Sequence, residues 1–237
     1  DYSNRTYRPS TLPNLGQNFY TSASNPVATN SQTFIYNWII EHTLNYSKTF
    51  GDHSFKFLGG FTSQKNYSEQ NGVTATNFPN DLVKTINAGT VISGSANIQE
   101  WSLMSLLSRV QYNYKNKYLA SAALRADGSS RFGPKNKWGY FPSASVGWRV
   151  SSEDFFDNIK TISNLKLRAS YGVTGNFQIG NYDHISKIDG RNYILGSGNG
   201  SIANGLVPVN VSNDRLGWET TSMIDFGLDI GFFSQDL

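Results

Sequence analysis

The chain of 237 residues contains no cysteine, and its charged residues make up 16% against about 25% in an average soluble protein. Without thiols it has neither a disulfide framework nor a thiolate metal site. The 20 basic and 17 acidic residues nearly balance, and the basic ones are scattered along the chain. These features exclude the concentrated basic surface by which proteins bind nucleic acid.

The sequence also lacks a long hydrophobic run. Nowhere do apolar residues continue for the roughly 18 positions that a transmembrane helix requires. Residues 1–5 do not resemble the start of a signal peptide. A membrane-spanning helix is therefore not predicted, whereas membrane-spanning strands remain compatible with the sequence.

Alternation of apolar and polar residues is the main pattern that is present. From Phe34 to Tyr46, most even-numbered positions are aromatic or aliphatic and most odd-numbered positions are polar. This period of two is typical of a strand with one apolar and one polar face. Its recurrence predicts about seven strands, near residues 33–47, 53–67, 98–114, 118–127, 139–150, 164–173 and 217–233. Most of them reach the length of about 9–11 residues with which a tilted strand crosses a bilayer.

The predicted connectors alternate in length. Those near residues 48–52, 115–117 and 152–163 are short or moderate, whereas residues 1–32, 68–97, 128–138 and 174–216 are expected to form external loops, mostly longer. Outer-membrane barrels have this asymmetry between short periplasmic turns and long external loops. Because about eight strands are needed to close the smallest membrane barrel, and open edges are costly in lipid, we expect a partial wall of a larger antiparallel up-and-down barrel.

Aromatic residues gather near the ends of the predicted strands. Amphipathic rings prefer the two membrane interfaces, so these residues are interpreted as two girdles. The girdle near the short turns contains Tyr46, Tyr112, Tyr114, Tyr118 and Trp148, and the other contains Tyr36, Tyr67, Phe141, Tyr171 and Trp218. A soluble β-sandwich that binds carbohydrate or acts in adhesion is the alternative, because its strands also alternate and pack their apolar face against a second sheet.

Five ordered blocks resemble the barrel of SusC/RagA-like TonB-dependent outer-membrane transporters. They are SRVQYNY at 108–114, LRADGSSRFGP at 124–134, YFPSASVGWRV at 140–150, LKLRASYGVTGN at 165–176, and LGWETT at 216–221 leading to DFGLDIGF at 225–232. Their order and spacing make the match specific from Ser105 onward. Residues 1–104 agree with the family in strand pattern only.

The resemblance implies a 22-stranded barrel in the bacterial outer membrane that imports glycan oligosaccharides or peptides. It further implies an N-terminal plug, a TonB box that contacts the inner-membrane TonB complex, and a SusD-like surface lipoprotein as partner. On this reading the chain is a middle-to-late part of the wall, and the plug, the TonB box and most strands lie outside it. The resemblance implies transport rather than enzymatic activity, and no cofactor.

The residues themselves offer little catalytic chemistry. His42, His53 and His184 are far apart, with no carboxylate at metal-ligand spacing. Asp225 and Asp229 share a strand face, but no nucleophile accompanies them. A hydrolase would require two carboxyl groups about 5–10 Å apart in an open pocket, and we expect no such pair.

Charged residues on the polar face are the candidate functional residues. In a barrel they would face the lumen and pair with one another, hold a plug, or line a solute path. They are Arg109, Arg125, Arg149, Lys166, Arg168, Glu219, Asp225 and Asp229. In the long connectors, Tyr182, Asn192 and Tyr193 are candidates for stacking on or hydrogen bonding to a sugar. The run DGSSRFG at 127–133 is either a substrate loop or a structural turn, and its turn-forming residues favour the turn.

Overall fold

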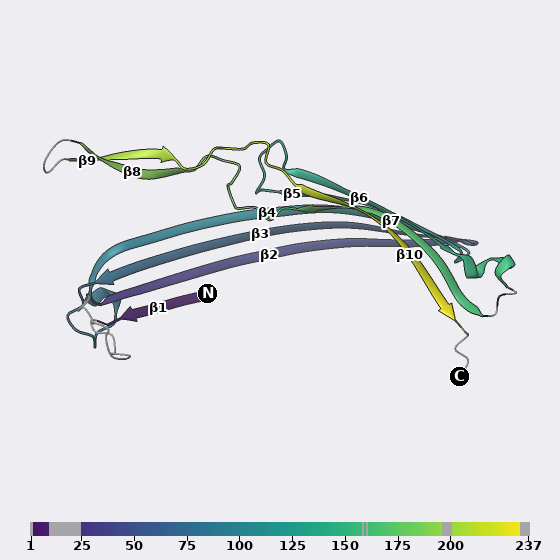
Figure 1. Cartoon of the computed structure of the whole chain (residues 1–237), viewed down its shortest axis with the longest axis horizontal. Coiled ribbons are helices and arrows are strands. Elements are labelled where there is room, and N and C mark those ends of the chain that lie inside the picture. The colour runs from purple at the N-terminus through teal and green to yellow at the C-terminus, as the bar shows by residue number, and fades with distance from the viewer. Residues whose placement is uncertain (1, 10–24, 158, 160, 196–200, 233–237) are drawn as a thin grey trace, which may run out of the picture. The chain divides into compact units, whose positions relative to one another are not determined.

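The computed structural model describes residues 2–9, 25–157, 159, 161–195 and 201–232. One sheet contains eight strands in the order β1-β2-β3-β4-β5-β6-β7-β10, and β8 and β9 form a separate hairpin (Figure 1). The sheet strands are β1 Tyr2–Arg8, β2 Val27–Phe50, β3 His53–Thr76, β4 Thr90–Tyr114, β5 Tyr118–Ser129, β6 Trp138–Arg149, β7 Ile162–Asn176 and β10 Glu219–Phe232. The hairpin consists of β8 Ile188–Leu195 and β9 Ser201–Pro208.

The described helical segments are single 3-10 turns. They are η1 Ile86–Ala88, η2 Val150–Ser152 and η3 Asp154–Phe156. Among the described residues, no helix has the length and apolar character needed to cross a bilayer. Regular structure in the described chain therefore consists almost entirely of strands.

Contacts divide the chain into two compact units. The first contains Asp1–Trp38 and Lys65–Trp101, and the second contains Ile39–Gln64 and Ser102–Leu237. Strands β2, β3 and β4 run through both units, while β5 to β10 belong to the second. The functional residues predicted from the sequence all lie in the second unit.

The first unit has a small core of its own. Ala28, Ala75 and Phe78 are buried, and the ring of Tyr7 packs edge-on against Phe78 with centroids 5.5 Å apart. The Tyr7 hydroxyl donates to Asp81 Oδ1 at 2.7 Å. These contacts fix β1, which contains Tyr7, beside the start of β2.

The prediction of an external loop over residues 1–32 is therefore wrong in part. Tyr2–Arg8 pairs with β2 in register from Tyr2↔Thr33 to Arg8↔Val27, and β2 begins at Val27. Residues 1 and 10–24 lie outside the described part of the chain. The segment YSNRTYR lacks a continuous apolar parity, so backbone pairing and the single anchor at Tyr7, rather than alternation, make it a strand.

Several strands are longer than the alternation predicts. β3 continues to Thr76 and β4 begins at Thr90, so most of the expected loop 68–97 is strand. The additional residues of β4 are exposed and rich in Ser, Gly and Asn. Since such a segment has no face to bury, its side chains carry no period-two signal even though its backbone pairs in the sheet. The hairpin β8–β9 likewise lies within the expected loop 174–216.

Short turns join the strands at one end of the second unit. Lys115 and Asn116 adopt positive φ values of 49° and 55° in the turn between β4 and β5, and the Lys117 amide donates to the Tyr114 carbonyl at 2.9 Å. The Lys115 amide donates to the carbonyl of Asp52 in the neighbouring turn at 3.0 Å. Adjacent turns therefore brace one another along this rim.

One face of the second unit is apolar and exposed. The register places Ala120, Val146, Ala169 and Phe226 in one row across β5, β6, β7 and β10. Val146 and Phe226 are 60% and 84% exposed. A β-sandwich would bury this row under a second sheet. The sandwich alternative is therefore wrong for the described residues.

Candidate functional site

The opposite, polar face carries all eight charged residues predicted from the sequence. Directly paired residues of an antiparallel sheet project from the same side. Arg109 pairs with Ala123, Arg125 with Phe141, Arg149 with Lys166, Arg168 with Gly227, Lys166 with Asp229, Asp225 with Ser170, and Glu219 with Asn176. Register between strands thus gathers residues that are far apart in the sequence.

The densest group lies toward the short-turn end of β6, β7 and β10. Arg149 and Asp229 flank Lys166 on its two neighbouring strands. Arg168 Nη2 donates to Asp229 Oδ1 at 2.8 Å. A Cβ at Gly227 would lie 2.9 Å from Arg168 Nη2, so glycine at this position leaves room for the guanidinium to cross the strand. Four of the eight predicted residues therefore meet here.

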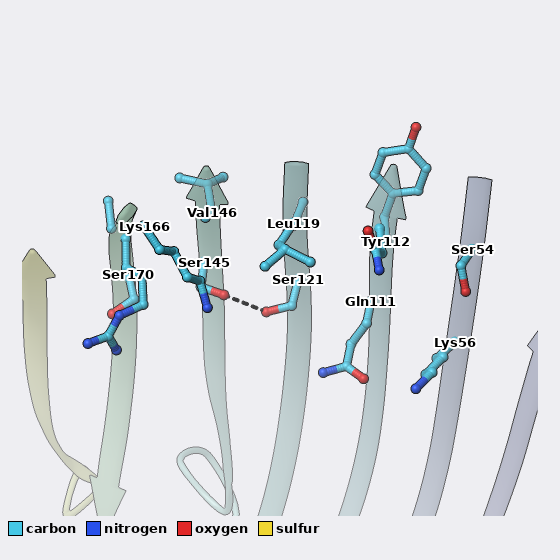
Figure 2. A pocket seen from close by; sticks show the side chains of 15 residues that line it. Ser54, Lys56, Gln111, Tyr112, Leu119, Ser121, Ser145, Val146, Lys166 and Ser170 are labelled. Atoms are coloured by element: carbon cyan, nitrogen blue, oxygen red, sulfur yellow. Dashed lines mark hydrogen bonds between the residues drawn. The ribbon is translucent and has the colours of Figure 1, made fainter. Parts of the chain in front are cut away.

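An open hollow of about 570 Å³ occupies this part of the sheet. Its polar lining comes from five strands, and Figure 2 shows Lys56 and Gln111 directed to the side opposite Tyr112 and Val146. The polar residues of the lining are Ser54, Lys56, Gln111, Asn113, Ser121, Ser145, Lys166, Arg168 and Ser170. Short serine side chains leave the space open, and the hydroxyls of Ser121 and Ser145 lie 2.7 Å apart. Hydroxyl, amide and cationic groups together suit an anionic or strongly polar occupant.

Arg125 is part of a local ion pair on β5. Its Nε donates to both carboxylate oxygens of Asp127, at 2.7 and 2.9 Å, and its Nη2 donates to Ser105 Oγ at 3.2 Å. Asp127 is buried, at 7% exposure. A buried carboxylate requires such partners, so Arg125 has a structural role here.

Of the remaining predicted charges, Asp225 pairs directly with Ser170, which lines the hollow. Arg109 and Glu219 lie outside its lining. Arg109 borders a smaller hollow of about 290 Å³ together with Lys56 and Gln111. Glu219 accepts a hydrogen bond from Asn176 Nδ2 at 3.1 Å at the loop end of β10. Among the described residues, no group of three or more histidine or acidic side chains is placed to hold a metal ion.

The predicted loop residues do not form one cluster. Asn192 and Tyr193 are consecutive in β8, so their side chains leave opposite faces of the hairpin. The Tyr193 ring lies over Gly205, where an added Cβ would be 2.9 Å from the ring. Tyr182 lies in the turn before the hairpin with a positive φ of 66°.

The run at 127–133 forms part of a loop core. Phe132 is only 1% exposed and its ring lies 5.0 Å from that of Trp218. The Trp218 ring also contacts Phe141 and Phe177, at 5.2 and 5.9 Å. Arg131 Nε donates to Asn181 Oδ1 at 2.9 Å. These contacts give the run a structural role and fix three connectors against one another.

Phe141 and Trp218 do not belong to a membrane girdle, contrary to the sequence interpretation. Phe141 pairs with Arg125 on the polar face and is 7% exposed. Phe141 alternates in step with Ser143 and Ser145 along the strand, so the sequence already indicated that its side chain lies on the polar face. Aromatic character alone was an insufficient criterion, because rings also fill loop cores.

A carboxylate at the short-turn rim was missed from the sequence. Glu153 Oε1 accepts hydrogen bonds from Tyr118 Oη at 2.7 Å and Trp148 Nε1 at 3.0 Å, and Lys117 Nζ contacts Oε2 at 3.2 Å. The hydrogen bonds from Tyr118 and then Trp148, with a smaller contribution from Lys117, hold the pKa of Glu153 below its ordinary value. This carboxylate orients two of the rings predicted for the girdle.

Lys56 and the serine row were also missed as site residues. Lys56 lies in one of the predicted strands. Because it is far from Lys166 in the sequence, the sequence does not show that both residues line one hollow. The serines Ser121, Ser145 and Ser170 are each ordinary polar-parity residues. Only the pairing of Ser145 with both Ser121 and Ser170 shows that they form one row.

Comparison with known proteins identifies the family. Residues 1–237 match the family model described as TonB dependent receptor-like, beta-barrel. The chain belongs to this family. TonB-dependent receptor P39 of Formosa agariphila is 38% identical over 206 residues, which cover 85% of this chain and 19% of that protein. TonB-dependent receptor SusC of Bacteroides thetaiotaomicron is 27% identical over 218 residues, covering 91% of this chain and 22% of SusC.

Solved structures agree with this fold. The chain superimposes on the RagAB peptide transporter with a TM-score of 0.85 and 24% identity, covering 98% of this chain and 25% of the matched one. The chain thus spans about a fifth to a quarter of the length of its relatives. Membership of the TonB-dependent receptors and the similarity to SusC confirm the SusC/RagA-like assignment and the outer-membrane location expected from the sequence.

Proposed function

We propose that this TonB-dependent receptor barrel segment is part of the wall of an importer for glycan oligosaccharides or peptides. The similarity to SusC and to the RagAB peptide transporter supports this assignment. The receptor works with a SusD-like surface lipoprotein and receives energy from the TonB complex. TonB contacts the plug and TonB box, which lie in parts of the receptor outside this segment.

One observation supports the transport role most directly. In the second unit, strands β5, β6, β7 and β10 form one sheet layer with an exposed apolar face and a charged polar face. In a bilayer the apolar face contacts lipid chains, and the polar face borders the barrel interior. The eight charged residues, from Arg109 to Asp229, then face the lumen or the plug.

Substrate capture is assigned to the external connectors. Tyr193 is 58% exposed on the hairpin β8–β9, and Tyr182 is 38% exposed in the preceding turn. Exposed rings of this kind can stack on the apolar face of a sugar ring, and the amide of Asn192 can hydrogen-bond to hydroxyl groups. Their separation makes them individual contacts rather than one site.

Single-cysteine labelling of the full-length receptor tests the orientation of the wall. The segment has no cysteine of its own, so Val146→Cys and Ser143→Cys each introduce one new thiol into it. A charged, water-soluble maleimide is expected to label Cys at 143 but not at 146 in intact membranes. After solubilisation and denaturation both should react. Labelling of position 146 in the membrane would contradict the assignment of lipid exposure.

Uptake measurements test the transport activity itself. Cells that carry the full-length receptor should accumulate labelled oligosaccharide or peptide from the medium, and a receptor deletion should lose this uptake. Dissipating the proton gradient or deleting the SusD-like partner should also reduce it. Unchanged uptake in the deletion strain, for every glycan and peptide that supports growth of the parent, would refute the proposed function.

A further inference from the structure

The apolar face of the second unit has a hollow of its own. This apolar hollow, about 680 Å³ in volume, lies across β4, β5, β6, β7 and β10. Two rows of directly paired residues line it. Nearer the external loops is the row Ala120, Val146, Ala169 and Phe226, and nearer the short turns is the row Tyr118, Trp148, Leu167 and Leu228. Its volume is within the range of about 300–1,000 Å³ that is usual for ligand pockets.

Small residues create the apolar hollow. Ala169 lies between Val146 and Phe226 on the two neighbouring strands. Val146 and Phe226 project from the sheet, and the half-buried Ala169 leaves a depression between them. Gly147 and Gly227 also belong to the lining. A slender apolar chain can therefore lie between these side chains and contact them on both sides.

The wall of the apolar hollow at the short-turn rim is held in place by the protein itself. Tyr118 and Trp148 both line the hollow, and both donate hydrogen bonds to Glu153 Oε1, at 2.7 and 3.0 Å. The Glu153 side chain is only 14% exposed. One carboxylate thus fixes two rings of the wall without help from an occupant. Binding to a preformed wall costs less ordering than binding to mobile side chains.

A cation and a carboxylate lie beside the same rings. Lys117, which precedes Tyr118, places its Nζ 3.0 Å from Asp154 Oδ1 and 3.2 Å from Glu153 Oε2. The Asp154 side chain is 98% exposed. A zwitterionic headgroup complements both signs, because its phosphate can accept from Lys117 while its ammonium donates to Asp154. An anionic headgroup without the ammonium would meet repulsion from Asp154.

We propose that the apolar hollow binds one glycerophospholipid with a phosphoethanolamine headgroup. An acyl chain lies along Ala169 between Val146 and Phe226, and the headgroup lies at Lys117 and Asp154. The hollow belongs to the face that contacts lipid chains, and the short-turn end of an outer-membrane barrel is periplasmic, so the lipid comes from the periplasmic leaflet. This inference goes beyond import and does not depend on the imported solute.

Native mass spectrometry of the full-length receptor, extracted from outer membranes in mild detergent, tests the acyl-chain site. Ala169→Phe fills the hollow with apolar atoms. Ala144→Phe is the matched control, because Ala144 lies on the same face but outside the lining. We expect the parent and Ala144→Phe to retain the phospholipid. Ala169→Phe should reduce its occupancy about tenfold or more, the loss expected when about two methylene groups are no longer buried.

The heat-modifiable band of the folded barrel shows whether each variant has folded. Absence of retained phospholipid from the parent, or equal retention by the two Phe variants, would overturn the proposal. A change from dimer to monomer in Ala169→Phe, with no phospholipid bound to the parent, would assign the hollow to a second receptor copy instead.

Photolabelling of the unmodified receptor in nanodiscs provides an independent measurement. Two phospholipids with the same diazirine-bearing acyl chain, one with a phosphoethanolamine and one with a phosphoglycerol headgroup, are compared by peptide mass spectrometry. The first should label Phe226 and Leu228 more than Ile224 and Ile230, which are also exposed on the apolar face of β10. Even labelling along β10 would indicate lipid without a preferred site and refute the proposal.

The headgroup contact has its own matched pair of variants. Asp154→Asn should abolish the preference for the phosphoethanolamine lipid, whereas Asp157→Asn, which changes an exposed carboxylate three residues further on, should preserve it. Equal labelling of the parent by the two lipids would contradict the headgroup assignment and with it the proposed ligand. All of these measurements are made without solute, so their failure is distinguishable from failure of the uptake assay.

Discussion

An arginine placed at Ala144 tests whether the apolar face contacts lipid. Ala144 is exposed on this face, where it pairs with Ala122 on β5 and Tyr171 on β7. The adjacent Ser143 lies on the polar face opposite Ala123 and Gly172, where a long side chain has room. Ala144→Arg and Ser143→Arg therefore differ mainly in the face from which the same charge projects.

The expected magnitude follows from depth in the bilayer. Trp148, four residues from Ala144 on the same face, lies beside the short-turn rim. With a rise of about 3.3 Å per residue and a tilt of about 40°, Ala144 lies about 10 Å deeper than Trp148. This is close to the middle of an apolar band about 25 Å tall, where arginine costs about 2–4 kcal/mol. Val146→Arg should cost less, because Val146 is nearer the rim.

Equilibrium unfolding of the full-length receptor from phospholipid vesicles measures this cost. Ala144→Arg should lower the free energy of unfolding by about 2–4 kcal/mol, and Ser143→Arg by less than about 1 kcal/mol. The fraction of heat-modifiable folded receptor in outer membranes should follow the same order. Equal effects at the two positions, or no effect at Ala144, would refute lipid contact of this face.

Three further predictions concern the loops and the short-turn rim. Phe132→Ala should destabilise the loop core by about 3–5 kcal/mol and speed proteolysis of the external connectors; unchanged cleavage would contradict the packing. Gly175→Val should perturb the same core, because a Cβ there would overlap the Phe141 ring, and Phe141→Ala should partly rescue it in the same assay. The pKa of Glu153 is lower in the folded state than in the unfolded state, so its stabilising contribution is present above the unfolded value and lost as pH falls below about 4.5. Trp148 fluorescence should report this acid transition, and a parent-like transition in Glu153→Gln would exclude Glu153 as its source.

The period-two pattern predicted the part of the sheet that has two different faces. Residues of β5, β6, β7 and β10 alternate because one side is apolar and the other carries charge. The eight charged residues were placed on one face for the same reason, since parity within a strand is a local property. Prediction succeeded where each face has its own environment.

Segments with two polar faces were not predicted. β1, the outer half of β4 and the hairpin β8–β9 contain Ser, Asn and Gly on both parities. Backbone hydrogen bonding makes them strands, and this requires a partner strand whose position the local sequence does not reveal. For Phe141 the prediction was wrong for a different reason. Its aromatic side chain suggested a position at the membrane interface, but Phe141 lies on the polar face and is buried against Trp218 in the loop core.

The sequence by itself determined the strand type, the two faces and the family, because alternation and ordered motifs are properties of neighbouring residues. Tertiary structure decided which strands are adjacent and in which register. Register alone brings Lys56 of β3 into one hollow with Lys166 and Arg168 of β7, across three intervening strands. Pairing between distant segments depends on the energy of the whole sheet, so no local pattern could have shown that cationic hollow.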